Sequence, residues 1–242
     1  MAMKVISLLK EKNADAYSSR PVTIGFLGDS VTNGCFEVFP DVSGGFDTVY
    51  DTESGYVSKI RKILATLYPK AQINIVNAGI SGDSAPGGLR RMDRDLLPYK
   101  PDLTVVCFGL NDSCEGEDKL QKYIDSLTAI IEKLKAAGSE VILMTPQPIC
   151  ARVHTKIDDE KLKNFAAHLV DIFKSGLFER YMNAAREVAK SCDVTLCDCY
   201  AKWMKMYENG VDITDLLANY VNHPTRDMHW LFAMSLVETM FN

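Results

Sequence analysis

Two small polar residues and a glycine follow apolar segments of the sequence and together could carry out acyl transfer. Ser30 follows the segment VTIGFL within GFLGDSVTNG, Gly82 follows INIVNA, and Asn111 follows LTVVCFG. A serine hydroxyl becomes an effective nucleophile when a base removes its proton, and an imidazole can do this near neutral pH. A glycine N–H and an asparagine amide are suitable donors to the oxyanion that forms when an ester carbonyl is attacked. The pattern predicts a nucleophile with two oxyanion donors, although Gly-Asp-Ser would also suit a plain strand-to-helix turn.

Short apolar segments alternate with helical ones along the chain. The apolar segments, nearly continuous as in strands covered on both faces, are 22–27, 73–78, 103–109, 140–146 and 194–198. The segments with helical character are 55–67, 119–137, much of 158–191, and 224–241. Strands that alternate with helices form a parallel sheet with helices on both sides, and ligands bind beyond the carboxyl ends of its strands. The sequence therefore predicts an α/β fold with a five-stranded parallel sheet.

The 242 residues are expected to form a single domain, 1–242. Residues 1–20 are interpreted as an N-terminal extension. Residues 35–54 make a long connection after Gly-Asp-Ser and are predicted to be an elaborated loop beside the active site. Its aromatic residues either pack the loop onto the domain, which we favour, or line an acyl or sugar pocket; they are Phe36, Phe39, Phe46 and Tyr50.

Composition and charge argue against several classes of function. A formal net charge of −5 gives no electrostatic basis for binding nucleic acid or an anionic membrane, and no apolar run approaches the roughly 20 residues of a membrane helix. Seven cysteines, an odd number, and a charged N-terminus without an evident signal peptide favour free thiols in a cytoplasmic protein. No G-x-G-x-x-G or Walker lysine motif is present, and Cys197-Asp-Cys199 lacks metal-site spacing. We expect neither a cofactor nor a metal.

Four motifs resemble the sequence blocks of the GDSL hydrolases, also called SGNH hydrolases. They are GFLGDSVTNG, NAGISGDS, FGLNDS and VNHPTRDMHWLFA, in the family's order and spread over residues 22–233. The resemblance implies a flavodoxin-like, three-layer α/β/α fold. It implies Ser30 as nucleophile, with its own N–H, the Gly82 N–H and the Asn111 amide forming the oxyanion hole. It also implies His223 as general base, while Val31 stands at the fourth letter of the GDSL name.

One position departs from the family pattern. The family usually has an aspartate three residues before the catalytic histidine, and this chain has Tyr220 there. A phenol stays protonated at neutral pH, so it cannot replace the carboxylate that orients the imidazole and stabilises the imidazolium. We favour a Ser–His dyad in which a backbone carbonyl or a neutral side chain accepts from Nδ1, with a displaced aspartate as the alternative. The candidate orienting side chains are Asp215, Asp212, Asn219 and Asn222.

The remaining histidines have plain structural interpretations. His229 falls inside the last predicted helix, where we expect a structural or supporting role. His154 and His168 lie in a polar segment and are expected at the surface or in packing contacts. Arg152, after the fourth predicted strand, is expected to lie in solvent near the rim of the site.

These residues predict a serine esterase that cleaves short acyl esters through an acyl-serine intermediate. Family analogy favours acetyl groups on a carbohydrate, so the expected partner is a small-molecule or oligosaccharide ester. The alternatives are an acylhydrolase of the lysophospholipase or thioesterase type, and a catalytically impaired carbohydrate-binding protein on the same fold.

Overall fold

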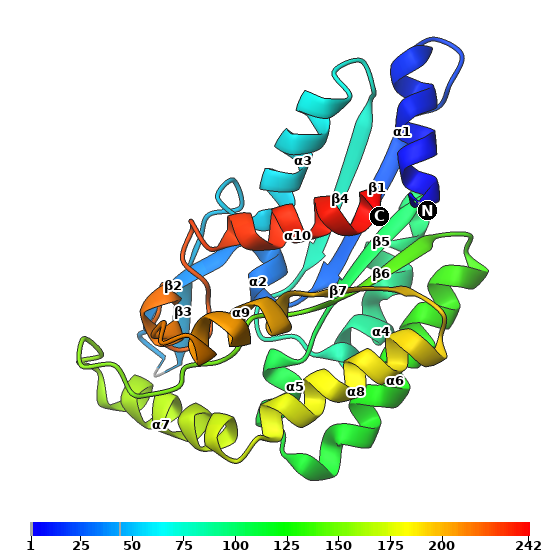
Figure 1. Cartoon of the computed structure of the whole chain (residues 1–242). Coiled ribbons are helices and arrows are strands. Elements are labelled where there is room, and N and C mark those ends of the chain that lie inside the picture. The colour runs from blue at the N-terminus through cyan, green and yellow to red at the C-terminus, as the bar shows by residue number, and fades with distance from the viewer. Residues whose placement is uncertain (1, 44) are drawn as a thin grey trace.

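The computed structural model describes residues 2–43 and 45–242, and its centre is a parallel sheet (Figure 1). The sheet has five strands in the order β4-β1-β5-β6-β7, and every neighbouring pair is parallel. The strands are β1 Val22–Gly28, β4 Ile73–Gly79, β5 Leu103–Cys107, β6 Glu140–Thr145 and β7 Thr195–Asp198. These are the five strands expected from the sequence, so the predicted fold class is confirmed.

Helices cover both faces of the sheet. Helices α3 and α10 pack together on one side with α1, and α4, α6 and α8 pack together on the other (Figure 1). The larger helices are α1 Lys4–Ala14, α3 Tyr56–Leu67, α4 Ala85–Asp95, α6 Leu120–Ala136, α7 Glu160–Lys174, α8 Leu177–Ser191, α9 Cys199–Glu208 and α10 His229–Phe241. Shorter turns are α2 Ser30–Asn33, α5 Leu110–Cys114, η1 Leu97–Tyr99, η2 Glu117–Lys119 and η3 Ile213–Leu216.

The central strands explain why the apolar segments are continuous. Every residue of β1 and of β5 is buried, because helices cover both faces of these strands. The edge strands β4 and β7 are only partly buried, and they carry polar residues such as Asn74, Asn77 and Asp198. The carboxyl ends of β1, β4 and β5 lie side by side, with Gly28 opposite both Gly79 and Cys107.

Three segments differ from the sequence-based prediction. The helical segment 158–191 is two helices, α7 and α8, separated at Gly176. The φ of 71° at Gly176 lies in the left-handed region and interrupts the helical conformation. The last helix begins at His229 and not near Pro224, because Pro224 forms a β-bridge with Leu217. Residues 35–54 contain an antiparallel hairpin, β2 Cys35–Pro40 and β3 Phe46–Tyr50, where an irregular loop was expected.

The segment 1–20 contains helix α1, which packs into the main core. Val5 and Leu9 are fully buried there. Both oxygens of the Glu140 carboxylate accept backbone N–H groups at the start of the helix, from Lys4 at 2.9 Å and Val5 at 3.0 Å. The first residue of β6 therefore fixes the N-terminus of α1.

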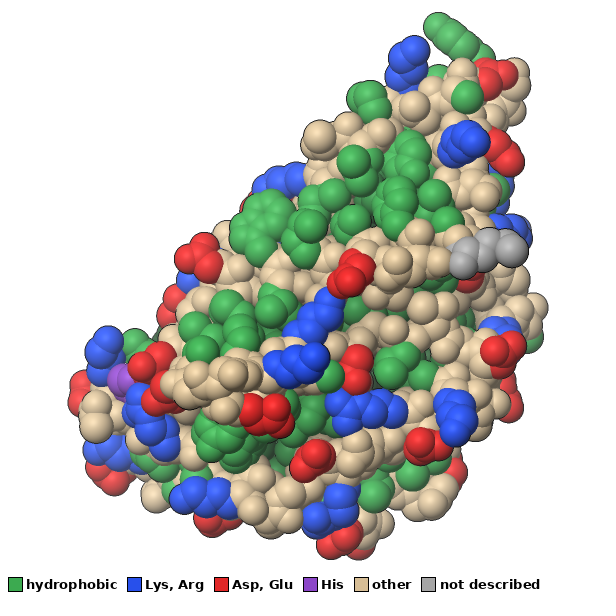
Figure 2. All heavy atoms as spheres, viewed as in Figure 1, with side chains coloured by type: hydrophobic (Ala, Val, Ile, Leu, Met, Phe, Trp, Pro, Cys, Tyr) green, Lys and Arg blue, Asp and Glu red, His purple; other side chains and the backbone are tan. Residues whose placement is uncertain are grey.

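The face of the molecule seen in Figure 2 carries charges of both signs and an apolar region. Figure 2 shows Lys and Arg side chains interspersed with Asp and Glu over the lower part of this face, while hydrophobic side chains gather over α3 and α10. Large hydrophobic side chains exposed on these two helices are Leu67, Trp230, Met234 and Phe241. Within the described ranges, no helix combines the length and apolar character needed to cross a bilayer.

Candidate active site

Ser30 lies at the point where β1 gives way to α2. Asp29 caps this short helix, and its Oδ1 accepts the Val31 N–H at 2.9 Å. Ser30 is the first helical residue and is 3% exposed. Its Oγ lies 2.9 Å from Nε2 of His223, which is 193 positions away in the sequence. The strand-to-helix turn thus presents the serine hydroxyl to an imidazole.

The two ring nitrogens of His223 have different partners. Nδ1 lies 2.8 Å from the backbone carbonyl oxygen of Phe36, and Nε2 faces Ser30. A carbonyl can only accept, so Nδ1 carries the proton and Nε2 is left with a lone pair toward the serine hydroxyl. Burial lowers the pKa of His223 to about 4, while the Phe36 carbonyl and the charge of Glu37 oppose this shift. The ring is therefore neutral over the neutral pH range and has the tautomer that a general base requires.

Asn219 fixes the backbone that carries His223. Its Oδ1 accepts three successive N–H groups, from Val221 at 3.0 Å, Asn222 at 2.9 Å and His223 at 3.0 Å. The buried Gln147 amide also donates to the carbonyl of Asn222. Asn219 therefore holds the loop and does not contact the imidazole ring through these bonds.

The structure does not bring the candidate aspartates to His223. Arg152 binds both Asp212 and Asp215, and Asp215 also lies 3.0 Å from Nε2 of His154. The displaced-aspartate hypothesis thus disagrees with the geometry, because both carboxylates belong to this separate ion-pair cluster. Arg152, expected in solvent, is one of its members.

Tyr220, which stands where the family usually has an aspartate, packs against His154. Its φ is 57°, in the left-handed region, and its ring stacks on His154 with a centroid distance of 4.0 Å. The Lys156 Nζ lies over the Tyr220 ring, 5.6 Å from the ring centroid. The residue that replaces the usual aspartate is therefore part of a packing contact.

The two predicted oxyanion donors line the same cavity as Ser30 and His223. Gly82 has a φ of 77°, and an added Cβ would meet no atom within 4 Å, so its backbone is accessible. One N–H of the Asn111 amide donates to the Asp83 carbonyl at 2.8 Å, which leaves the second N–H for another acceptor. The cavity has a volume of about 200 Å³. Its other lining residues are Val38, Phe46, Ser81, Leu162, Phe165, Asn219, Val221 and Asn222.

The hairpin that supplies the Phe36 carbonyl is held by Arg226. The guanidinium binds both oxygens of Glu37, at 2.6 and 3.1 Å, and its Nε binds Asp51 at 2.8 Å. It also lies 4.3 Å from the centroid of the buried Phe36 ring. We call Arg226, Glu37 and Asp51 the hairpin clamp, because they tie β2 and the residue after β3 to the segment that follows His223.

The sequence predicted a backbone carbonyl as one possible acceptor for Nδ1, but it did not indicate that Phe36 supplies it, and it gave no prediction of the hairpin clamp. Every residue has a carbonyl, so residue type carries no signal for such an acceptor. The clamp did leave a trace, because Arg226 lies in the last motif and the segment 35–54 is rich in acidic residues, Glu37 and Asp51 among them.

Among the loop aromatics, Phe36 packs in the core and Phe46 lines the cavity, while Phe39 and Tyr50 are exposed. That the cavity binds an acyl group or a sugar stays a prediction.

His229 supports the site from behind. It is fully buried, and its Nδ1 accepts the Tyr56 N–H at 3.0 Å. Its ring lies 4.9 Å from the Phe36 ring, and burial lowers its pKa to about 3. A neutral, buried histidine at this position acts as packing beneath the hairpin, in keeping with the structural role expected from the sequence.

Two buried carboxyl groups flank the site residues. Asp29 and Asp112 each accept a backbone N–H through Oδ1, from Val31 and from Ala85 at 2.9 Å. Their Oδ2 atoms are buried without a partner within the part of the chain that the structure describes. Burial raises the pKa of each group to about 7. Asp29 therefore binds the first turn of α2 beside Ser30, and Asp112, the neighbour of Asn111, binds the first residue of α4.

Sequence comparisons find esterases among the relatives of this chain. The chain is 31% identical to the acetylxylan esterase of Geobacillus stearothermophilus over 130 residues, which cover 50% of this chain and 58% of that protein. It is 36% identical to esterase TesA of Pseudomonas aeruginosa over 94 residues, 39% of this chain and 45% of the relative. These matches span about half the length of each relative.

Solved structures share the fold over nearly the whole chain. The acetylxylan esterase Axe2 of Geobacillus stearothermophilus matches with a TM-score of 0.67 at 20% identity, covering 90% of this chain and 94% of that one. The acetyl xylan esterase AlAXEase matches with a TM-score of 0.66 at 22% identity, covering 90% and 98%. A family model matches residues 26–231, from the middle of β1 into α10. The chain belongs to the GDSL-like Lipase/Acylhydrolase family.

Proposed function

We propose that this protein is a serine esterase that hydrolyses short-chain acyl esters, acetyl esters of carbohydrates in particular. The observation that carries the proposal is the chain of contacts from Ser30 Oγ to His223 Nε2 at 2.9 Å and from Nδ1 to the Phe36 carbonyl at 2.8 Å. This chain opens into a cavity that also contains Gly82 and Asn111. A nucleophile, a base of the correct tautomer and two donors beside one cavity are the parts that acyl transfer needs.

In the proposed first half-reaction, Ser30 Oγ attacks the ester carbonyl carbon and its proton passes to Nε2 of His223. The electron pair of the carbonyl moves to oxygen, and the N–H groups of Ser30 and Gly82 and the free N–H of Asn111 donate to that oxyanion. When the intermediate collapses, the bond to the alkoxide oxygen breaks and His223 protonates the leaving alcohol. The products are the free alcohol and an acyl-serine.

In the second half-reaction, water attacks the acyl-serine while His223 takes a proton from it. Collapse of the second intermediate returns the proton to Ser30 Oγ and releases the carboxylic acid. The Phe36 carbonyl holds the imidazole in place throughout, and the nearby negative charge of Glu37 favours the imidazolium that forms transiently.

The size and lining of the cavity support a short acyl group. A volume of about 200 Å³, with the apolar side chains of Val38, Phe46 and Leu162 among its walls, suits an acetyl group and the ester atoms around it. The carbohydrate part of the proposal is supported by the relative named acetylxylan esterase. A reducing, cytoplasmic location is supported by the seven cysteines, all of them free thiols.

Rates on p-nitrophenyl acetate, butyrate and octanoate test the proposal. We expect the wild type to hydrolyse the acetate fastest, and Ser30→Ala and His223→Ala to lower kcat by about three orders of magnitude or more. His168→Ala is the matched control, because this histidine is exposed on α7, and it should keep the wild-type rate. A wild type no faster than Ser30→Ala on every ester would refute hydrolysis. A preference for octanoate would favour an acylhydrolase of the lysophospholipase or thioesterase type.

A further inference from the structure

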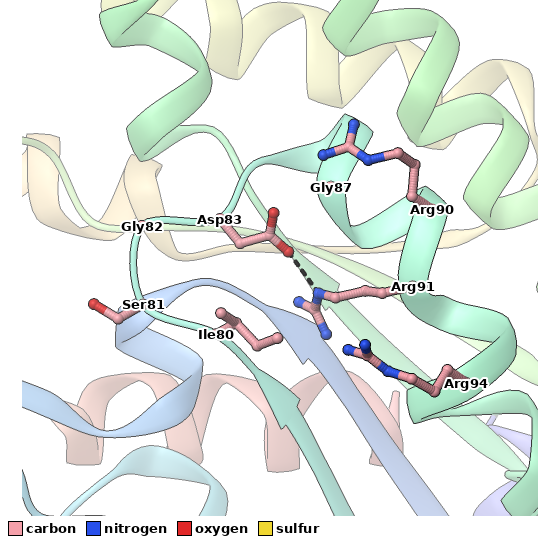
Figure 3. Close-up of a pocket in the computed structure, with 8 residues that line it drawn as sticks. All are labelled: Ile80, Ser81, Gly82, Asp83, Gly87, Arg90, Arg91 and Arg94. Carbon is pink, nitrogen blue, oxygen red and sulfur yellow. Dashed lines mark hydrogen bonds and ion pairs between the residues drawn. The ribbon is translucent and has the colours of Figure 1, made fainter.

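A second hollow adjoins the proposed active site. It has a volume of about 490 Å³ and lies between the loop that follows β4 and the helix α4 (Figure 3). Ser81 and Gly82 line both this hollow and the active-site cavity. Its full lining is Ile80, Ser81, Gly82, Asp83, Gly87, Arg90, Arg91 and Arg94, and we call it the arginine hollow. A substrate whose acyl group lies at Ser30 can therefore extend past Gly82 into it.

Arg91 builds the wall of the hollow. Its side chain is 9% exposed, and it binds the Asp83 carboxylate at 2.6 Å and the carbonyls of Ala78 and Gly28 at 2.6 and 2.9 Å. Figure 3 shows it pointing from α4 toward Asp83. Gly87 makes this approach possible, because a Cβ there would lie 1.7 Å from Asp83 Oδ1. Arg91 thus ties the end of β1 to the loop that carries Gly82.

The other two arginines face solvent. The Arg94 side chain is 75% exposed and pairs with Asp95. Arg90 is exposed, and its side chain has no hydrogen bond or ion pair within the described part of the chain. The two residues are four positions apart on α4, so they lie on one face of the helix. Arg90 in particular has all of its guanidinium donors available to a ligand.

The balance of charge points to a singly charged anion. Asp83 and Asp95 offset two of the three arginines, which leaves one positive charge in excess in a chain whose net charge is −5. By contrast, the residues that line the active-site cavity include no aspartate, glutamate, lysine or arginine. A carboxylate on the substrate thus has a favourable place in the arginine hollow and none in the acyl cavity, and guanidinium groups bind carboxylates in bidentate geometry.

We propose that the arginine hollow binds a carboxylate carried by the alcohol part of the ester, such as the uronic acid of an acetylated acidic oligosaccharide. This proposal rests on the proposed esterase function and names its substrate class. Arg90 and Arg94 contact the carboxylate, while Arg91 keeps the wall and the oxyanion loop in place. The hollow therefore determines specificity for the alcohol and not for the acyl group.

The test compares two acetylated xylooligosaccharides that differ only in a uronic acid substituent. The wild type should show a kcat/KM about 10-fold higher on the uronate-bearing substrate, because its KM for that substrate is lower. Addition of 0.5 M NaCl should reduce this preference. Arg90→Gln/Arg94→Gln should bring the preference below about twofold and leave the rate on the neutral oligosaccharide unchanged. Arg61→Gln, an exposed arginine on α3, is the matched control and should keep the wild-type preference.

The outcomes separate this proposal from the proposed function. Equal kcat/KM of the wild type on the two oligosaccharides would overturn the carboxylate site while leaving the esterase intact. The same conclusion would follow if the double variant lost activity equally on both substrates. Hydrolysis of p-nitrophenyl acetate with no hydrolysis of either oligosaccharide would refute the carbohydrate specificity, and the carboxylate site with it. Retention of the preference at high salt and in the double variant would assign it to another part of the surface.

Discussion

At the scale of single residues, the main feature is a buried base with a neutral acceptor. His223 donates to a carbonyl oxygen, where a carboxylate would compensate the imidazolium charge directly. Its pKa is lowered to about 4, so the base form persists in acid, but the imidazolium that forms during turnover is less favourable. Glu37 supplies the nearby negative charge that partly offsets this.

We therefore expect the acid limb of kcat/KM for p-nitrophenyl acetate to fall near pH 4 and not near 6.5. Glu37→Gln should move the limb to lower pH and reduce kcat, because a negative charge that raises the pKa of His223 is lost. Asp51→Asn is the matched control, since Asp51 also binds Arg226 but has no comparable influence on His223. It should leave the limb in place. Equal shifts in the two variants would assign the effect to hairpin geometry.

At the scale of elements, the β2–β3 hairpin supplies the acceptor for His223 in the proposed mechanism, where the family usually has an aspartate. The hairpin brings the Phe36 carbonyl to His223 from 187 positions away, and the hairpin clamp fixes its position. A carbonyl acceptor is only as well placed as the segment that carries it. Positioning of the base therefore depends on the ion pairs of Arg226, which touches neither the serine nor the imidazole in these contacts.

Removal of the clamp should lower kcat more than it raises KM. We expect Arg226→Ala to reduce kcat about 10- to 100-fold, because a displacement of about 1 Å at a catalytic group can have an effect of this size. Arg226→Lys should recover part of the loss, since lysine keeps the charge but not the bidentate geometry. Arg180→Ala, which removes a comparable surface pair with Glu117, serves as the control. A kcat loss no larger than the loss of folded protein, measured by circular dichroism, would contradict a positioning role.

At the scale of the whole molecule, the buried carboxyl groups link stability to pH. The pKa of Asp112 is raised from about 3.8 in the unfolded chain to about 7 in the fold by burial. Its contribution to stability is complete below pH 4 and is lost as the pH rises to 7, because the unfolded state releases its proton more readily. His223 and His229 act in the opposite direction, with pKa values lowered to about 4 and about 3. Their contribution is lost as the pH falls below about 6.5.

Asp112→Asn isolates the carboxyl contribution. The amide oxygen can still accept the Ala85 N–H, whereas the buried charge at high pH is gone. We expect the variant to gain about 1–3 kcal/mol in free energy of unfolding relative to wild type between pH 5 and pH 8. Urea unfolding at both pH values measures this, and the two histidines cancel because both proteins contain them. An unchanged difference between the proteins at the two pH values would mean that the raised pKa of Asp112 has no effect on stability.

The parts of the fold that could be predicted are those that a short, continuous stretch of sequence specifies. Continuous apolar runs specify buried parallel strands, and the Gly-Asp-Ser and Gly-Leu-Asn-Asp sequences follow directly from strands β1 and β5. The family resemblance then supplied the roles of Ser30 and His223. The structure brings these two side chains together, and their catalytic roles stay proposals for the variants above to test.

The remaining parts depend on contacts between distant segments. Helix α10 begins later than expected because Pro224 pairs with Leu217. The β2–β3 hairpin is held by the ion pair between Arg226 and Glu37. Helix α1 is part of the core because Glu140 receives its first N–H groups. None of these contacts is visible in a short window of sequence, since each is decided by a partner more than five residues away.

The carbonyl of Phe36 has an implication for how such proteins are recognised and altered. A backbone carbonyl is present whichever residue occupies position 36, so a substitution there removes the buried Phe36 ring but not the oxygen atom that faces His223. Alanine scanning at this position would report the loss of the buried ring and not the role of the carbonyl, and a search for the D-x-x-H signature would find no match in this chain. Chains of this kind depend on an entire folded hairpin in place of a single aspartate. Their inactivating mutations should therefore cluster among the residues that anchor that hairpin.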